Sequence, residues 1–153
     1  MIATTHGLLV AAGTLELSNK FMSATVSSAG DLVGMVANVS GASPHNFTND
    51  SWAVELSDFN ATTNGVLLSS KTCTAPTVTA SSPSGATFRY MCDGGAWCIE
   101  VNYALPAGGK HIVKGLSVTR GDGTARWTGT IRSLELWRGL ALTGGDKAYV
   151  GNF

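Results

Sequence analysis

The sequence predicts an all-β protein, an antiparallel β-sandwich, on the basis of three observations. Apolar and polar residues alternate over many short segments, which is the pattern of half-buried strands. Clusters rich in Gly, Ser, Asn and Asp separate these segments, and the chain holds 19 glycines. No stretch of about 12 residues keeps the apolar spacing of an amphipathic helix. About ten strands joined by short turns are typical of a sandwich of antiparallel sheets.

The strongest strand pattern lies in the middle of the chain, where every second residue from Trp97 to Leu105 is apolar. Such a segment is half-buried in an antiparallel sheet, so we expect Trp97 in the core, together with Trp52 from an earlier strand. We also expect core side chains from a late extended segment, and the candidates are Trp127, Ile131, Leu134, Leu136, Trp137 and Leu140. In chain order, the expected strands cover residues 15–17, 21–26, 32–36, 52–56, 65–69, 76–80, 86–91, 97–105, 111–119 and the extended segment 126–142.

The first expected hairpin contains no obvious catalytic motif. We expect Asn19, Gly30 and Asp31 to serve the backbone geometry of its turns, because these residue types favour turn conformations. Phe21 and Val33 lie on its strands, and we expect both to face the core.

Composition and charge limit the number of domains and the classes of function that this chain can have. The 153 residues fit one domain, residues 1–153, with no linker or low-complexity tract. Ten acidic residues balance ten basic ones, so the net charge gives no case for nucleic acid or an anionic membrane as partner. No run approaches the roughly 20 apolar residues that cross a bilayer. We expect residues 7–13 to begin the first strand; the alternative is a short signal-peptide core, which here lacks a basic start.

The three cysteines are Cys73, Cys92 and Cys98, and we expect one disulfide and one free thiol. Cys92 and Cys98 flank an expected hairpin turn and are one possible pair; Cys73 with Cys92 is the other. Three buried thiols are the alternative. The spacing does not match a zinc site, and we expect no metal.

Four N-x-S/T triplets are candidate N-glycosylation sites. Their acceptor residues are Asn38, Asn46, Asn49 and Asn60. Together with the low charge and the cysteines, they favour a secreted or extracellular protein.

Two parts of the chain resemble the galactose-mutarotase-like β-supersandwich. The first is LSNKFMSATV (residues 17–26) followed by AGDLVGM (residues 29–35), which is similar to the entry hairpin of that family. The second is WCIEVNYAL (residues 97–105) with KGLSV (residues 114–118). The chain departs from the family pattern at Lys20, where glycine is usual.

This resemblance implies the N-terminal, non-catalytic domain of a secreted glycoside hydrolase, or as second choice of a polysaccharide lyase. Its partners would be carbohydrate and a catalytic domain of the same polypeptide, with no cofactor. The alternatives are a stand-alone carbohydrate-binding or adhesion module and an aldose-epimerase-like enzyme. The last needs a Glu base and a His acid, and His45 and His111 match no family motif, so we expect them in a loop and at a solvated strand start.

The candidate contacts with sugar are aromatic and carboxylate side chains, because sugar rings stack on aromatic faces and their hydroxyls bind carboxylates. Trp127 and Trp137 each adjoin an arginine, and we expect one of them to be a stacking platform or a contact for another domain. Glu100 lies on a strand face opposite the apolar residues and is a candidate polar contact. No carboxylate pair suits glycoside cleavage, so we assign no catalytic residue.

Overall fold

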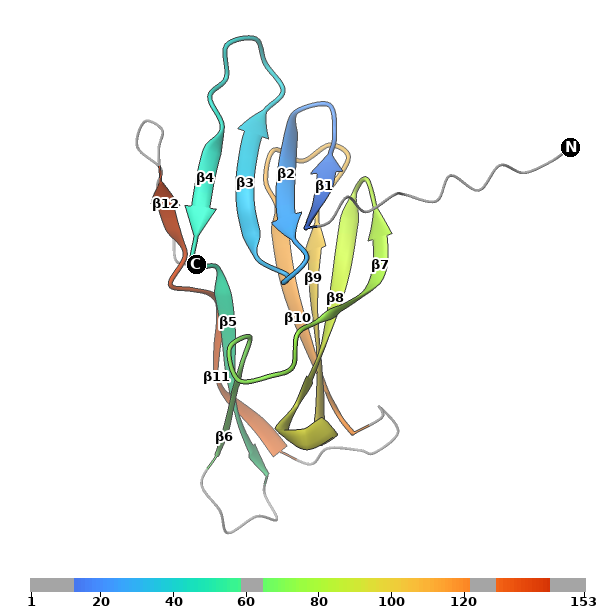
Figure 1. The fold of residues 1–153 in the computed structure, drawn as a ribbon, viewed down its shortest axis with the longest axis vertical. Helices are drawn as coiled ribbons and strands as arrows, with labels where there is room; N and C mark the ends of the chain where they lie inside the picture. The colour runs from blue at the N-terminus through green and yellow to red at the C-terminus, as the bar shows by residue number, and fades with distance from the viewer. Residues whose placement is uncertain (1–12, 59–64, 122–128, 144–153) are drawn as a thin grey trace, which may run out of the picture.

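The described part of the chain forms an all-β, antiparallel sandwich, as predicted. A computed structural model describes residues 13–58, 65–121 and 129–143. Its twelve strands form three sheets (Figure 1), and the only helical element among the described residues is the 3-10 turn η1 (Asp93–Gly95). In this part of the chain there is no apolar helix of membrane-spanning length.

The first sheet holds the predicted entry hairpin. Its strand order is β1-β2-β3-β4-β12, which means that the last described strand returns to pair with β4. The strands are β1 (Thr14–Ser18), β2 (Met22–Ser27), β3 (Leu32–Ala37), β4 (His45–Thr48) and β12 (Ala141–Thr143).

The other two sheets contain the longer strands. One has the order β10-β9-β8-β7 and the other the order β11-β5-β6. The former comprises β7 (Thr77–Ser82), β8 (Gly85–Cys92), β9 (Trp97–Ala104) and β10 (Val113–Arg120). The latter comprises β5 (Ser51–Asp58), β6 (Val66–Ser69) and β11 (Gly129–Arg138).

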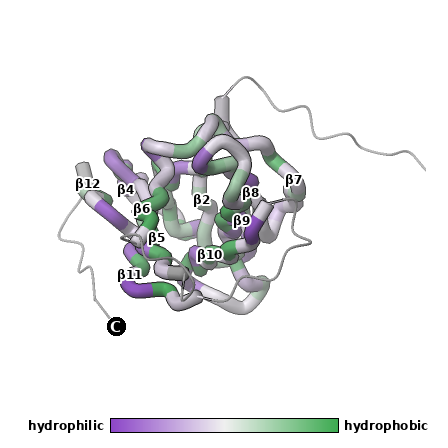
Figure 2. Tube along the Cα trace, turned by 90° about the horizontal axis from the view of Figure 1, so that it is seen from below, coloured by the Kyte–Doolittle hydropathy of each residue, from purple (hydrophilic) through white to green (hydrophobic). Residues whose placement is uncertain are grey.

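All three sheets contribute to one hydrophobic core. Alternation along β9 directs Trp97, Ile99, Val101 and Tyr103 inward, and Trp52 enters from β5, as the sequence predicts. Seen from below, β5 and β11 lie on one side of the interior and β8, β9 and β10 on the other (Figure 2). The core therefore holds together strands that are far apart in the sequence.

Cys73 and Cys92 form the disulfide, and Cys98 is a buried free thiol. The expectation of one bridge and one thiol is confirmed, while the Cys92–Cys98 alternative is wrong. Cys92 stands opposite Trp97 in the ladder, so Cys98, the next residue along β9, projects from the other face of the sheet. A disulfide is typical of an oxidising compartment.

The prediction that Ile131 and Leu134 lie in the core is wrong. Their side chains are 48% and 45% exposed. Strand β11 is the outer strand of its sheet, and its register along β5 shifts twice, so the middle of β11 lies at the margin of the core. The prediction that His45 is a loop residue is also wrong, because His45 begins β4. His111 is exposed just before β10, as expected.

Two expectations for the entry hairpin need correction. Phe21 and Val33 are only half-buried, and neither belongs to the buried core. Among the described non-glycine residues, only Asn49 and Asp93 have a positive φ, so Asn19 does not serve its turn through a left-handed backbone. It acts through its side chain, which becomes important at the site described next.

Candidate functional site

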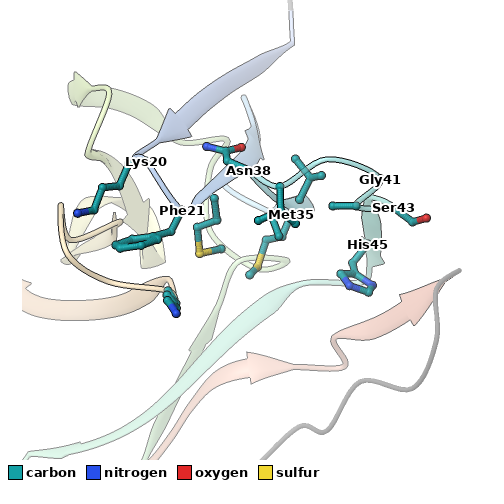
Figure 3. A pocket seen from close by; sticks show the side chains of 13 residues that line it. Lys20, Phe21, Met35, Asn38, Gly41, Ser43 and His45 are labelled. Atoms are coloured by element: carbon teal, nitrogen blue, oxygen red, sulfur yellow. The ribbon is translucent and has the colours of Figure 1, made fainter.

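The described part of the chain contains an open groove of about 1020 Å³. It lies where the β1–β2, β3–β4 and β9–β10 connections meet, and this volume is at the upper end of those typical for ligand pockets. Lys20 and Phe21 lie at one end of the groove, Met35 in the middle, and Ser43 and His45 at the other end (Figure 3). Its described lining contains no carboxylate.

Phe21 is the aromatic residue of this groove, and two lysines approach its ring. Lys20 Nζ lies 4.7 Å from the ring centroid and Lys110 Nζ lies 5.3 Å from it. Both distances are within the range of cation–π attraction. Neither lysine forms an ion pair with a carboxylate among the described residues. The site is thus an aromatic ring with two ammonium groups over it.

Asn19 joins the two loops that supply these residues. Its Nδ2 donates to Pro106 O at 2.6 Å and to Gly109 O at 2.9 Å, in the β9–β10 connection beside Lys110. Its Oδ1 accepts hydrogen bonds from the backbone N–H groups of Phe21 at 2.8 Å and Met22 at 3.0 Å. The amide side chain uses both donors and accepts twice, so it positions the ring relative to Lys110.

Asn38 attaches the third loop in a similar way. Its backbone N–H donates to Phe21 O at 2.7 Å, and its Nδ2 donates to Asn19 O at 2.6 Å. The three connections that line the groove are therefore linked by hydrogen bonds before any ligand arrives. Such preorganisation lowers the entropy that binding must overcome.

His45 contributes an unpaired polar atom at the far end of the groove. Its Nδ1 is buried and has no hydrogen-bond partner among the described residues. A buried polar atom without a partner is costly.

A second cluster, of buried charged and polar side chains, lies at the opposite end of β2 and β3. Lys114 Nζ donates to Asp50 Oδ1 at 2.7 Å, and the two side chains are 1% and 0% exposed. Asp50 Oδ2 accepts from the Leu32 N–H at 2.8 Å and lies 2.7 Å from the Tyr103 hydroxyl. That hydroxyl is also 2.8 Å from Gly30 O. We call Asp50, Tyr103 and Lys114 the buried cluster.

The buried cluster stabilises the turn of the entry hairpin, because Tyr103 and Asp50 form hydrogen bonds to the backbone of Gly30 and Leu32. Gly30 has a φ of 82°, and a Cβ placed on it would overlap the Tyr90 hydroxyl. That hydroxyl donates to Ala29 O at 2.8 Å. Only glycine fits this combination of left-handed backbone and close contact.

Burial and charge shift the titration of the groups around this turn. Burial lowers the pKa of Lys114, and the Asp50 carboxylate opposes that shift. Burial raises the pKa of Tyr103, and Asp50 adds to the rise. Burial also raises the pKa of Tyr90 to about 12. The pKa of Asp31 rises because the carboxyl is partly desolvated and lies near Asp50.

The structure does not bring the predicted sugar-contacting residues together. Trp137 is half-buried, its ring centroid 6.2 Å from that of Tyr103 and 4.6 Å from Lys114 Nζ, on the inner side of the β7–β10 sheet. Glu100 lies on the outer face of β9 and pairs with Arg89 at 2.7 Å. Trp127 lies outside the described residues. The proposed roles of the three in sugar binding stay predictions.

The candidate glycosylation sites have different surroundings. Asn38 is exposed and lines the groove, Asn46 lies within β4, and Asn49 is exposed between β4 and β5. Asn60 lies outside the described residues. Glycosylation of Asn38 would replace a hydrogen on the nitrogen that donates to Asn19 O.

Sequence reasoning missed the groove because its residues come from three separate connections. Asn19 lies 90 positions from its acceptor Gly109, and no local sequence pattern predicts a contact over that separation. One signal was present: Lys20 stands where the resembled family usually has glycine. That departure places a charged side chain beside Phe21.

Comparisons with models of known protein families, with curated proteins and with solved structures find no significant match to this chain.

Proposed function

We propose that this chain is a non-catalytic, carbohydrate-binding β-sandwich of a secreted carbohydrate-active protein, and that the groove around Phe21 is its saccharide contact. The observation that carries the proposal is the ring of Phe21, half-buried at an open groove and fixed by the hydrogen bonds of Asn19. Sugar rings place their C–H faces on such rings. A preorganised aromatic surface is therefore suited to holding a saccharide.

Several further features support this function. The resemblance of two segments to the galactose-mutarotase-like supersandwich favours a domain that accompanies glycoside hydrolases. The disulfide between Cys73 and Cys92 fits secretion. The groove offers amide, hydroxyl and imidazole groups, from Asn38, Ser43 and His45, beside its apolar surface. Orientation by a few polar groups around an apolar surface is usual in binding sites.

Contact with a catalytic domain is the second part of the proposal, and the exposed middle of β11 supports it. Ile131 and Leu134 leave apolar side chains uncovered at the outer edge of the three-stranded sheet. An apolar edge strand of this kind is suited to packing against another domain. Substituting both by lysine should weaken the association with such a domain while leaving saccharide binding by the groove unchanged.

Saccharide binding is tested by titration calorimetry of the chain, produced without N-glycans, against a panel of neutral and acidic oligosaccharides. Phe21→Ala should abolish binding, Phe21→Tyr should retain it, and urea unfolding should show that each variant folds. Leu67→Ala, at an exposed apolar position on β6 outside the groove, is the matched control. A chain that binds no saccharide of the panel, or a Phe21→Ala variant that binds as well as the parent chain, would overturn the proposal.

A further inference from the structure

We infer that the groove is selective for acidic saccharides, whose sugar rings carry a carboxylate or a sulfate; this inference rests on the proposed saccharide-binding function. The reason is the arrangement of charge around Phe21. Lys20 and Lys110 come from different connections, yet both ammonium groups lie within about 5 Å of the centre of one ring. A saccharide bound against this ring would lie close to both charges.

The positive charge at this site is local and has no carboxylate partner there. The whole chain is neutral, with ten acidic and ten basic residues. No described carboxylate lines the groove, and no described ion pair includes Lys20 or Lys110. By contrast, Lys114 is paired with Asp50, and Arg89 is paired with Glu100. Two ammonium groups at one ring repel each other, and an anion bound near the ring relieves that repulsion.

The ring and the lysines together favour an acidic sugar over a simple anion or a neutral sugar. Phe21 supplies a surface for the apolar face of a sugar ring, which an inorganic anion lacks. The lysines supply attraction that a neutral sugar does not use. The lysine ammonium group is a compact charge and lacks the planar, two-pronged donor geometry of the arginine guanidinium group. It can therefore bind a carboxylate or a sulfate equally well.

The far end of the groove extends the same site. Met35 provides apolar surface between the lysines and His45 (Figure 3), and Val39 adds apolar lining to the groove. A neighbouring sugar unit reaching that end would meet the Ser43 hydroxyl and the half-buried imidazole of His45. An oligosaccharide should therefore bind more tightly than the corresponding monosaccharide.

The test compares a galacturonic acid trimer, a sulfated galactose trimer and a neutral galactose trimer by calorimetry, at low and at physiological salt. At low salt an acidic trimer should bind about tenfold more tightly than the neutral one. Lys20→Gln and Lys110→Gln should each lower the affinity for the acidic trimers, and the double variant should remove most of the preference over the neutral trimer. Lys71→Gln, at an exposed lysine outside the groove, is the matched control.

Each outcome decides a different point. Equal affinity for acidic and neutral trimers would overturn the selectivity and leave the proposed function standing. No binding of any trimer would overturn both. A preference that survives both groove substitutions, or that falls equally in Lys71→Gln, would overturn the assignment to Lys20 and Lys110. Competition by sodium acetate or sodium sulfate at matched ionic strength, as strong as that by the acidic trimers, would show an anion site and contradict saccharide selectivity.

Discussion

Removal of the ammonium group of Lys114 is predicted to destabilise the fold strongly. In Lys114→Met the Asp50 carboxylate keeps only the Leu32 N–H and the Tyr103 hydroxyl as partners. Because the Asp50 side chain is fully buried, the loss leaves an uncompensated charge in the interior. Breaking a buried pair in this way costs about 3–5 kcal/mol of unfolding free energy.

A second ion pair of the same length provides the control. Arg89 and Glu100 also approach to 2.7 Å, but their side chains are 49% and 36% exposed. Exposed pairs contribute little to stability because solvent screens the charges, so Arg89→Gln should cost far less unfolding free energy than Lys114→Met. The contrast isolates burial as the cause, since the distances between the charged groups are equal.

The assay is urea unfolding of the oxidised protein, followed by tryptophan fluorescence. The double variant Asp50→Asn, Lys114→Met should be more stable than the sum of the two single losses predicts, because it leaves no charge without a partner. A Lys114→Met cost below about 1 kcal/mol, or additive losses in the double variant, would refute this account of the buried cluster.

The remaining predictions concern the turn and the disulfide. Gly30→Ala should lower the free energy of unfolding by about 2–4 kcal/mol, and Gly41→Ala by about 1 kcal/mol. Both glycines have a φ near 80°, but of the two only Gly30 lies against a side chain. Equal losses in urea unfolding would contradict this. The pKa of the Asp31 carboxyl in the folded protein is raised above its ordinary value of 3.8, so the fold favours the protonated carboxyl. This contribution to the free energy of unfolding is fully present below pH 3.8 and is lost as the pH rises through the folded-state pKa of Asp31. Asp31→Asn should therefore be more stable than the parent chain at neutral pH and not in acid, and a pH-independent difference would be evidence against this. Replacing both Cys73 and Cys92 by serine should cost about 3 kcal/mol, from the 19-residue separation they bridge; unchanged urea unfolding would show that the bridge is dispensable.

The strands with regular alternation could be predicted from the sequence, because burial of one face of a strand requires an apolar residue at every second position. Residues 97–105 predict β9 and its inward side chains, and the structure confirms them. Strand β4 was missed because it has only four residues, HNFT, with two aromatic side chains among polar ones. So short a segment gains its strand conformation from pairing with β3 and β12, and not from its own pattern.

The candidate site was less predictable than the fold, for a physical reason. The selection of Trp137 rested on its arginine neighbour, but that neighbour does not determine how deep the ring lies. The ring contacts Tyr103 and Lys114, which are distant in the sequence. Likewise, the groove exists because Asn19 bonds to the β9–β10 connection. Contacts of this kind depend on the completed tertiary structure.

The most direct test of the account is the location of a bound acidic oligosaccharide. Amide chemical-shift changes on titrating the chain with the galacturonic acid trimer should centre on Lys20, Phe21 and Lys110, and should disappear in Phe21→Ala. Changes centred on Glu100 or Trp137, with the groove unperturbed, would contradict the assignment of saccharide binding to the groove.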